Sequence, residues 1–376
     1  MDEEDLDLTL LGINAVLAGE ILWEHTAAGE ASRLNLGPKF NFTPSLLVKK
    51  AQELGIPCAA LSSYIPLELG RRHIFQLVFE ILKLAHIAGK DLKSVMSRQK
   101  MLIIGSTDHM LQILLRIIYD LRGLIPIQNI WSMGQGSFHG LEKISGKWEF
   151  DPRSPKYLHN HGSMAMQKTM ENQIYHFDSK GQLSLFTRKE FFEELSHFKD
   201  LVSYNIEDLD YLTTAIDFGS LGLAIQKKEA GYGMMMEVVF NNPERPIKGG
   251  LCAFDPILQQ DVMIESFRLK GILPENIRYL NKNFNHYLNP QKTFQKLNEE
   301  GLFMPVLVKD GYLYFQPVQG DINFLTKTVF FRRKTMTSIN SLKSPEDIPN
   351  ALKAMESQDK QPGFKKIIEI QLENQI

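Results

Sequence analysis

The chain has little cysteine and lacks long apolar runs. Its 376 residues include two cysteines, Cys58 and Cys252, which lie far apart in the sequence and are flanked by apolar residues. Two cysteines exclude a disulfide framework, and we expect both to be small core residues of a protein from a reducing compartment. No apolar run approaches the roughly 20 residues that a membrane-spanning helix needs.

An excess of positive charge is also missing. Lys plus Arg total 42 and Asp plus Glu total 44, so the formal net charge is −2. Proteins that bind nucleic acid usually carry a basic excess, so we expect no nucleic-acid partner. The N-terminus begins Met-Asp-Glu-Glu-Asp, a charge opposite to that of a signal peptide. These features predict a cytoplasmic protein without a membrane partner. They leave room for a small phosphorylated ligand, which needs only a local cluster of lysines and arginines.

The order of the predicted elements indicates an α/β fold. Met101–Ile104 is typical of a buried strand, and a polar Gly-Ser-Thr-Asp turn and a predicted helix over 109–121 follow it. A strand, a polar turn and a helix in sequence form the unit of an open parallel sheet, whose ligands bind outside the carboxyl ends of the strands. Further helices are predicted over 4–22, 43–54 and 71–89, strands over 127–131, 201–206 and 215–225, and a hairpin around Lys309-Asp-Gly311.

These elements divide the chain into three parts. We expect an N-terminal helical segment over 1–22, a main α/β domain over 23–338, and a C-terminal tail over 339–376. The tail is polar and contains Pro345, Pro349 and Pro362, so we expect it to pack loosely apart from Ile367–Ile370.

A small-residue loop near the N-terminus is the first candidate for ligand binding. Ala27-Ala-Gly-Glu-Ala-Ser-Arg33 precedes Pro38-Lys39. Small residues let a backbone come close to a base or a phosphate, and Arg33 and Lys39 could neutralise phosphate charge. Taken alone, the segment is more typical of a loop that leads into a helix and carries surface cations.

The match is not isolated, because further motifs follow it in order. The opening segment is similar to the signature of nucleotide-sugar pyrophosphorylases, in which Gly-Gly-x-Gly-Thr-Arg-Leu precedes Pro-Lys. Over roughly residues 20–340 the chain therefore resembles the UDP-sugar pyrophosphorylases, with features of the UDP-glucose and UDP-N-acetylhexosamine branches. The other matching segments are Ile104–Thr107, Met133–Gly136, His159–Ser163, Asn205–Leu209, Met236–Val239, Lys248–Gly250, Asn281–Tyr287 and Arg332–Lys334.

The resemblance implies a fold, a reaction and a set of site residues. The fold would be a Rossmann-like nucleotidyltransferase, similar to the glycosyltransferase-A fold, with a mixed sheet flanked by helices. The reaction would join UTP to a sugar 1-phosphate with Mg²⁺, forming a UDP-sugar and pyrophosphate. The implied site comprises Arg33, Lys39 and Lys334 as catalytic cations at the phosphates, Ala28, Gly29, Gln135, His161 and Gly162 at the nucleotide, Glu237, Lys248, Gly249, Asn281 and Asn283 at the sugar phosphate, and Glu207 and Asp208 at the metal.

Departures from the family pattern keep other hypotheses open. Ala31 stands where the second signature glycine is usual, Ser163 stands where Asp is usual, and Glu207-Asp208 replaces the usual Asp-Asn. These changes motivate the alternative of a protein that binds a nucleotide or nucleotide-sugar without turnover. A second alternative is an enzyme of this fold that uses a polyol phosphate or CTP. Neither the sugar nor the oligomeric state follows from the sequence.

Individual site residues also have plainer interpretations. Lys248 and Lys334 could be solvated surface charges, and Glu207 and Asp208 could begin a helix. The asparagines over 281–289 could be turn residues.

Overall fold

Four parallel strands lie at the centre of the molecule, and the sequence predicted three of them; the fourth covers residues 21–26, so the helix predicted over 4–22 is wrong at its end and stops at Ala18. The computed structural model describes residues 3–29, 33–58, 64–244, 246, 248–333 and 340–373. In it β1 (Ile21–Thr26), β2 (Lys100–Ser106), β3 (Ile130–Gln135) and β10 (Asp200–Asn205) lie side by side and run parallel. The two faces of β1 pack into different cores, because Ile21 and Trp23 join one and Leu22 joins the other. Burial on both faces explains why these strands read as continuous apolar runs.

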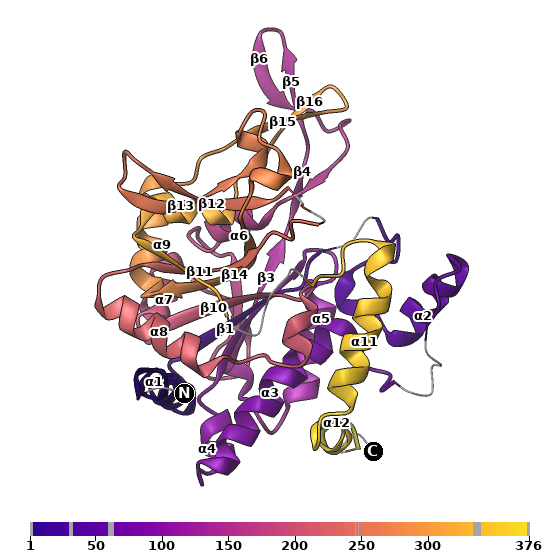
Figure 1. Cartoon of the computed structure of the whole chain (residues 1–376), viewed down its shortest axis with the longest axis vertical. Coiled ribbons are helices and arrows are strands. Elements are labelled where there is room, and N and C mark those ends of the chain that lie inside the picture. Colours follow the sequence, from indigo (N-terminus) through magenta and orange to yellow (C-terminus); the bar gives the residue numbers. More distant parts are fainter. Residues whose placement is uncertain are drawn as a thin grey trace.

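Antiparallel strands extend this centre on both sides, so the sheet is mixed. Among the described residues it has 11 strands, in the order β13-β12-β14-β10-β1-β2-β3-β8-β9, with β11 paired to β14 and β17. The α/β class with a mixed sheet flanked by helices is confirmed (Figure 1). The added strands are β8 (Ile174–Phe177), β9 (Leu183–Leu185), β11 (Met234–Phe240), β12 (Gly250–Asp255), β13 (Gln260–Glu265), β14 (Tyr279–Leu288) and β17 (Thr328–Phe331).

Most helices begin and end at the residues that the sequence signals. Thr43 caps α2 (Pro44–Glu53), because its side chain accepts a hydrogen bond from the backbone N–H of Leu46. Gly89, with a φ of +61°, follows the end of α3 (Leu69–Ile87). The other helices of the first 333 residues are α1 (Glu3–Ala18), α4 (Leu92–Met96), α5 (Met110–Leu121), α6 (His161–Gln167), α7 (Arg188–Leu195), α8 (Phe218–Glu229), α9 (Pro290–Glu300) and α10 (Ile322–Leu325).

The strand predicted over 215–225 is wrong, because this segment lies mainly in helix α8. Asp217 starts the helix by accepting a hydrogen bond from the N–H of Ser220 at 3.0 Å. A short apolar run does not distinguish a buried strand from a buried helix. The N-terminal helix α1 packs directly on α8, where Gly222 lies so close to α1 that an added Cβ would come within 1.8 Å of the Leu8 carbonyl oxygen.

The C-terminal segment is folded onto the domain, so the prediction of a loosely packed tail is wrong for residues 340–373. It forms α11 (Ile348–Asp359) and α12 (Phe364–Glu373), and α11 lies beside α2 in a shared apolar core (Figure 1). Arg72 of α3, which is fully buried, anchors it by donating to Asp359 at 2.7 Å and to Gln358 at 3.0 Å.

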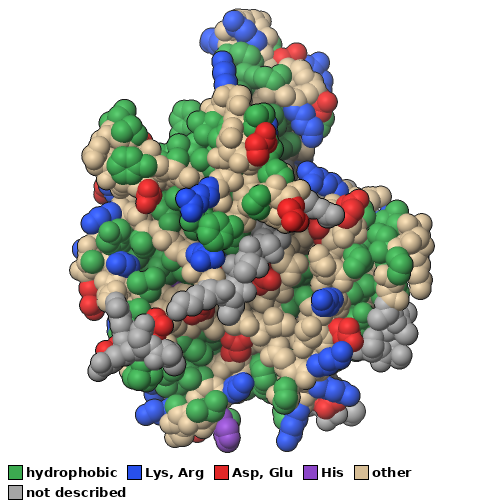
Figure 2. Space-filling model, viewed as in Figure 1, with side chains coloured by type: hydrophobic (Ala, Val, Ile, Leu, Met, Phe, Trp, Pro, Cys, Tyr) green, Lys and Arg blue, Asp and Glu red, His purple; other side chains and the backbone are tan. Residues whose placement is uncertain are grey.

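A separate antiparallel sheet projects from the main body as an arm. It consists of β5 (Leu141–Ile144), β6 (Lys147–Phe150), β15 (Val306–Lys309) and β16 (Tyr312–Phe315) (Figure 1). The predicted hairpin is confirmed, with Asp310 and Gly311 at positive φ between β15 and β16. Hydrophobic side chains, including Trp148 and Phe150, are exposed on this arm at the top of the view (Figure 2). Near its base, β4 (Ser137–Phe138) pairs with β7 (Tyr157–Leu158).

In the part of the chain that the structure describes, no helix is both long enough and apolar enough to cross a membrane.

Candidate functional site

The carboxyl ends of the parallel strands open into a first cavity of about 620 Å³. Thr26 and Ala28 come from the end of β1, Gln135 from the end of β3, and Asn205 and Glu207 from the end of β10. Parallel strands bring the residues that follow them to one edge of a sheet, which is why positions more than a hundred residues apart meet here. The predicted site residues that line this cavity are Ala28, Gly29, Gln135, His161, Glu207 and Asn283.

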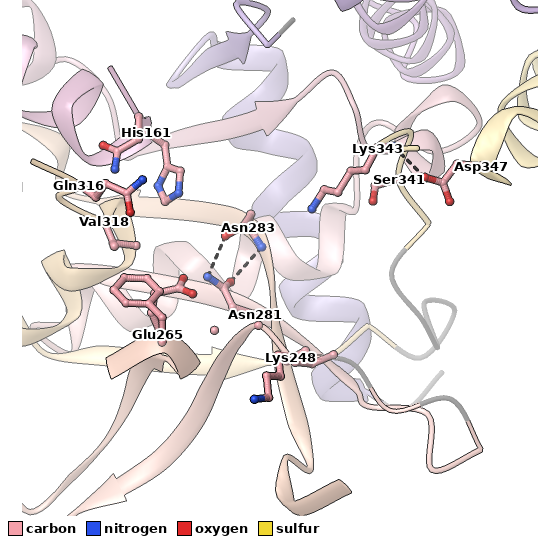
Figure 3. A pocket seen from close by; sticks show the side chains of 15 residues that line it. His161, Lys248, Glu265, Asn281, Asn283, Gln316, Val318, Ser341, Lys343 and Asp347 are labelled. Carbon is pink, nitrogen blue, oxygen red and sulfur yellow. Dashed lines mark hydrogen bonds between the residues drawn. The ribbon is translucent and has the colours of Figure 1, made fainter. Parts of the chain in front are cut away.

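A second cavity of about 540 Å³ lies beside the first, over β14 (Figure 3). Predicted residues that line it are Lys248, Gly249, Asn281, Asn283 and His161. Ser341, Lys343 and Asp347 of the C-terminal segment also line this cavity. The two cavities adjoin, because Asn160, His161, Asn283, Gln316 and Lys343 line both.

A carboxylate held between two lysines lies at the edge of the first cavity. Lys39 forms an ion pair with Oε2 of Glu207, and the Lys343 ammonium lies 3.2 Å from Oε1. Burial by itself would raise the pKa of Glu207, but the charges of Lys343 and Lys39 outweigh it and hold that pKa below its usual range. Glu207 is therefore ionised, and the group of three carries a net charge of about +1.

The other predicted metal ligand, Asp208, belongs to a different charge cluster. Its carboxylate lies 3.7 Å from the ammonium of Lys282, which also pairs with Asp210. Burial raises the pKa of Asp208 to about 7. Asp208 does not line either cavity. It therefore cannot face a ligand together with Glu207 in this arrangement.

These residues do not fit a ready-made Mg²⁺ site. Mg²⁺ prefers several oxygen ligands in an octahedral arrangement, whereas each oxygen of Glu207 faces a lysine. Over the described ranges, no three His, Cys, Asp or Glu side chains come close enough together to hold a metal ion. The Mg²⁺ requirement stays a prediction of the resemblance, and no step below depends on it.

A neutral histidine stands where the two cavities meet. The backbone N–H of Gln319 donates to Nδ1 of His161 at 3.1 Å, which leaves the proton of the neutral ring on Nε2. Burial lowers the pKa of His161 to about 4, so the ring is uncharged at neutral pH. Close by, the side-chain amide of Gln135 donates to the carbonyl of His159. Both side chains are thus held in fixed orientations beside the first cavity.

A backbone irregularity turns two asparagines toward the second cavity. Asn283 has a φ of +61°, a conformation that asparagine tolerates better than most residues, and the pairing of β14 with β11 shifts beside it. Asn281 and Asn283 bond to each other twice, at 2.9 Å and 3.0 Å (Figure 3). The pair presents fixed amide groups, which suit the recognition of hydroxyls.

Two predicted ligand residues have other roles in the structure. Glu237 is fully buried away from both cavities, where Arg333 donates to its two oxygens at 2.9 Å and 2.5 Å. The expectation that it binds a sugar is corrected, because its charge is neutralised inside the fold. Gly162 lies against the backbone, and an added Cβ would come within 2.1 Å of the Pro317 carbonyl oxygen. Its lack of a side chain serves packing, and it does not line either cavity.

The structure describes two of the three predicted catalytic cations. Lys39 is buried, and its backbone N–H donates to the carbonyl of Gly29 at 2.9 Å, which holds the loop against the lysine. Neither Lys39 nor the exposed Arg33 is among the residues that line the cavities, although Lys39 pairs with Glu207, which lines the first. Lys334 and the departure at Ala31 lie outside the described residues.

Several residues at the site escaped the sequence interpretation, and Lys343 matters most among them. It lies in the segment that was expected to be a loose tail. Ser203 and Lys309, which line the first cavity, carry no motif signal either. A usable signal for the C-terminal segment was present, because Ile348, Leu352 and Met355 recur at helical spacing and predict an apolar face that must pack on something.

Comparison with known proteins identifies the fold. The sequence matches no protein-family model, and no curated protein matches it by sequence. Solved structures do match. The UDP-N-acetylglucosamine pyrophosphorylase of Trypanosoma brucei has a TM-score of 0.63 and 14% identity, with 92% of this chain and 67% of that chain covered. A structure from Entamoeba histolytica assigned to the same enzyme has a TM-score of 0.59 and 13% identity, with 90% and 80% covered.

The UDP-glucose branch gives a similar result. A point variant of the UDP-glucose pyrophosphorylase of Leishmania major, solved in complex with UDP-glucose, has a TM-score of 0.54 and 11% identity. That comparison covers 89% of this chain and 66% of the Leishmania chain, so this chain spans about two thirds of the length of that enzyme. The fold is that of the UDP-sugar pyrophosphorylases, and the fold predicted from the motifs is confirmed.

Proposed function

We propose that this chain, which has the fold of the UDP-sugar pyrophosphorylases, is a uridylyltransferase that forms a UDP-sugar and pyrophosphate from UTP and a sugar 1-phosphate. One observation carries the proposal: two adjoining cavities at the carboxyl edge of the sheet meet beside the Lys39–Glu207–Lys343 group. One cavity would hold the nucleotide and the other the sugar. The phosphates of both would then lie where the positive charge is concentrated.

The reaction needs no side chain as a nucleophile, and it depends mainly on the alignment of the two substrates. An oxygen of the sugar 1-phosphate attacks the α-phosphorus of UTP, a P–O bond forms, and the bond to the leaving pyrophosphate breaks. The obstacle is the repulsion between two polyanions, and fixed cations lower it. We assign this role to Lys39, which is buried and cannot swing away without breaking its ion pair with Glu207.

The other lining residues would bind and orient the two substrates. Gln135 and the Nε2–H of His161 would contact the nucleotide, and the small Ala28 and Gly29 would let it approach the backbone. Lys248, Asn281 and Asn283 would contact the sugar phosphate. The second cavity also offers Glu265 as an acceptor for a sugar hydroxyl.

The test is pyrophosphate release with Mg²⁺, UTP and a panel of sugar 1-phosphates that includes glucose, galactose and N-acetylglucosamine. Turnover with one sugar and UTP, and little with CTP, supports the proposal and names the substrate. A panel that includes a polyol phosphate separates the proposed enzyme from one of the same fold with another acceptor.

One observation favours a second candidate, a protein that binds a nucleotide-sugar without turnover. Both oxygens of Glu207 are occupied by lysines, where an enzyme that depends on a metal would leave its carboxylate open. This candidate predicts that UDP-sugars bind and that no sugar 1-phosphate in the panel releases pyrophosphate.

A further inference from the structure

We propose that the arm, formed by β5, β6, β15 and β16, is a dimer interface whose apolar face packs against the same face of a second copy of this chain. The inference does not rest on the proposed function, because no residue of this face lines either cavity. It assigns a role to the hydrophobic side chains that gather on the arm at the top of the view (Figure 2).

The pairing of the four strands gathers apolar side chains on one face of the arm. Leu141 in β5 is paired with Phe150 on one side and with Leu313 on the other. Leu313 is paired in turn with Val308, so a row of apolar side chains crosses all four strands. Directly opposed residues share a face, and side chains alternate along each strand. The apolar face of the arm therefore consists of the charged Lys143 and the apolar residues Leu141, Trp148, Phe150, Val306, Val308, Leu313 and Phe315.

The opposite face of the arm is the one that meets the body and the first cavity. Lys309 lines the first cavity, and the hydroxyl of Tyr314 donates to the carbonyl of Pro155 at 2.9 Å. Both residues alternate with those of the apolar face along their strands, so the apolar face points away from the cavity. It cannot act as a lid over a ligand there, and a partner that covers it must come from outside this body.

The apolar face of the arm exposes a large hydrophobic surface. Trp148 and Phe150 are 54% and 59% exposed, and Val306 and Val308 are 53% and 68% exposed. Within the described ranges, no side chain of this face joins a hydrophobic core cluster. Since a whole aromatic side chain offers about 150–250 Å², the face exposes on the order of 500 Å². An exposed apolar patch of this size often marks an interaction site.

The area and the charge of the arm favour a second copy as the partner. Two such faces would bury on the order of 1000 Å² together, which reaches the lower limit of a specific interface. The charges of the two hairpins balance, because the acidic and basic residues of 141–150 and 306–315 are Glu142, Glu149 and Asp310 against Lys143, Lys147 and Lys309. Balanced charge does not repel an identical arm, and it lacks the basic excess that anionic lipids or nucleic acids attract.

The shape of the arm also suits a two-fold contact. The arm projects from the main body, so two copies can bring their apolar faces together while their bodies stay apart (Figure 1). Packed sheets lie about 10 Å apart and enclose their inner side chains as a sandwich. A two-fold contact uses the same surface on both copies, and one apolar sheet face supplies both halves of such a sandwich.

The experiment measures the mass of the full chain by sedimentation velocity over roughly 1 to 100 µM, the range in which an interface at the lower size limit would dissociate. We expect the wild type to change from monomer to dimer as its concentration rises. Phe150→Lys should weaken dimerisation about 100-fold or more, because a charge enters the contact twice. Val308→Lys, which changes the other hairpin, should have the same effect.

A matched control separates the arm from exposed aromatic residues in general. Phe254 of β12 is 59% exposed, the same fraction as Phe150, and it lies outside the arm. Phe254→Lys should therefore dimerise like the wild type. Circular dichroism checks that each variant is folded, which we expect because each altered side chain is exposed.

Three outcomes would overturn the proposal. A wild type that stays monomeric over the whole range would leave the face to a different partner. A dimer that survives both Phe150→Lys and Val308→Lys, or that Phe254→Lys weakens equally, would form through another surface. Hydrogen exchange gives the third test, because dimerisation should slow exchange over 141–150 and 306–315. Slower exchange confined to other segments would place the contact elsewhere.

Discussion

The two cavities are built in different ways. One wall of the first is formed by residues at the carboxyl ends of parallel strands, so the topology of the sheet places that wall. The second depends on an irregular strand, β14, and on a segment that arrives from the C-terminus. That wall of the first cavity follows from the parallel sheet, whereas the residues that both cavities share, such as Asn283 and Lys343, come from the irregular strand and the C-terminal segment.

The largest effect should come from the anchor of the C-terminal segment. Arg72→Met removes a buried guanidinium and leaves Asp359 without its charge partner, which should lower the free energy of unfolding by about 3–5 kcal/mol. Urea unfolding measures this loss, and Arg98→Met at an exposed position is the control. Hydrogen exchange should rise most over α11 and α12. An exposed ion pair contributes at most about 1 kcal/mol. If Arg72→Met lowers the free energy of unfolding by less than that, Arg72 does not anchor the C-terminal segment.

Next in size is the loss of Lys39, the buried cation that pairs with Glu207 at the first cavity. Lys39→Ala should lower kcat by about 100- to 1000-fold, the usual cost of removing one fixed group that stabilises charge in the transition state. The assay is pyrophosphate release, and Lys49→Ala, on the exposed side of α2, should retain full activity. Unchanged turnover of a folded Lys39→Ala protein would remove Lys39 from the reaction.

A reciprocal pair of variants tests the division between the cavities. Asn281 lines only the second cavity and Gln135 only the first. Asn281→Ala should raise the KM for the sugar 1-phosphate about 5-fold and leave that for UTP unchanged, because one hydrogen bond to a hydroxyl contributes about 1 kcal/mol. Gln135→Ala should raise the KM for UTP and leave that for the sugar 1-phosphate unchanged. If each variant raised both KM values equally, the two cavities would not hold separate substrates.

The smallest effect concerns pH and the histidine where the cavities meet. The pKa of His161 is about 4 in the folded protein and 6.5 when exposed, so the unfolded state binds more protons between these values. Its contribution to stability is complete above pH 6.5 and falls as the pH decreases, by about 1 kcal/mol at pH 5.5. Between pH 7.5 and 5.5, His161→Gln should therefore lose about 1 kcal/mol less than the wild type in denaturant unfolding. Parallel losses would show that His161 is not buried as described.

Local signals predicted the first cavity better than the second. The cap at Thr43, the stop at Gly89 and the hairpin at Asp310-Gly311 depend on a few neighbouring residues, so the sequence reveals them directly. The motif resemblance predicted Gln135 and Glu207, and both line the first cavity because parallel strands end at one edge of the sheet.

Long-range contacts explain what the sequence did not predict. Glu237 lies in a motif, yet a distant arginine, Arg333, neutralises it inside the fold. Lys343 is the opposite case, because it lies in no predicted motif and yet lines the site. The segment that carries it is held in place by α11, which Arg72 anchors. Such pairings depend on three-dimensional neighbours, and neither composition nor spacing records them.

The most direct test of this account is the structure of the protein with a bound UDP-sugar. The account predicts the uracil beside Gln135 and His161, the sugar over Asn281 and Asn283, and the diphosphate within hydrogen-bond distance of the ammonium groups of Lys39 and Lys343. A UDP-sugar bound elsewhere, or a diphosphate that contacts neither lysine, would contradict the claim that the two cavities are joined through the phosphates of their ligands.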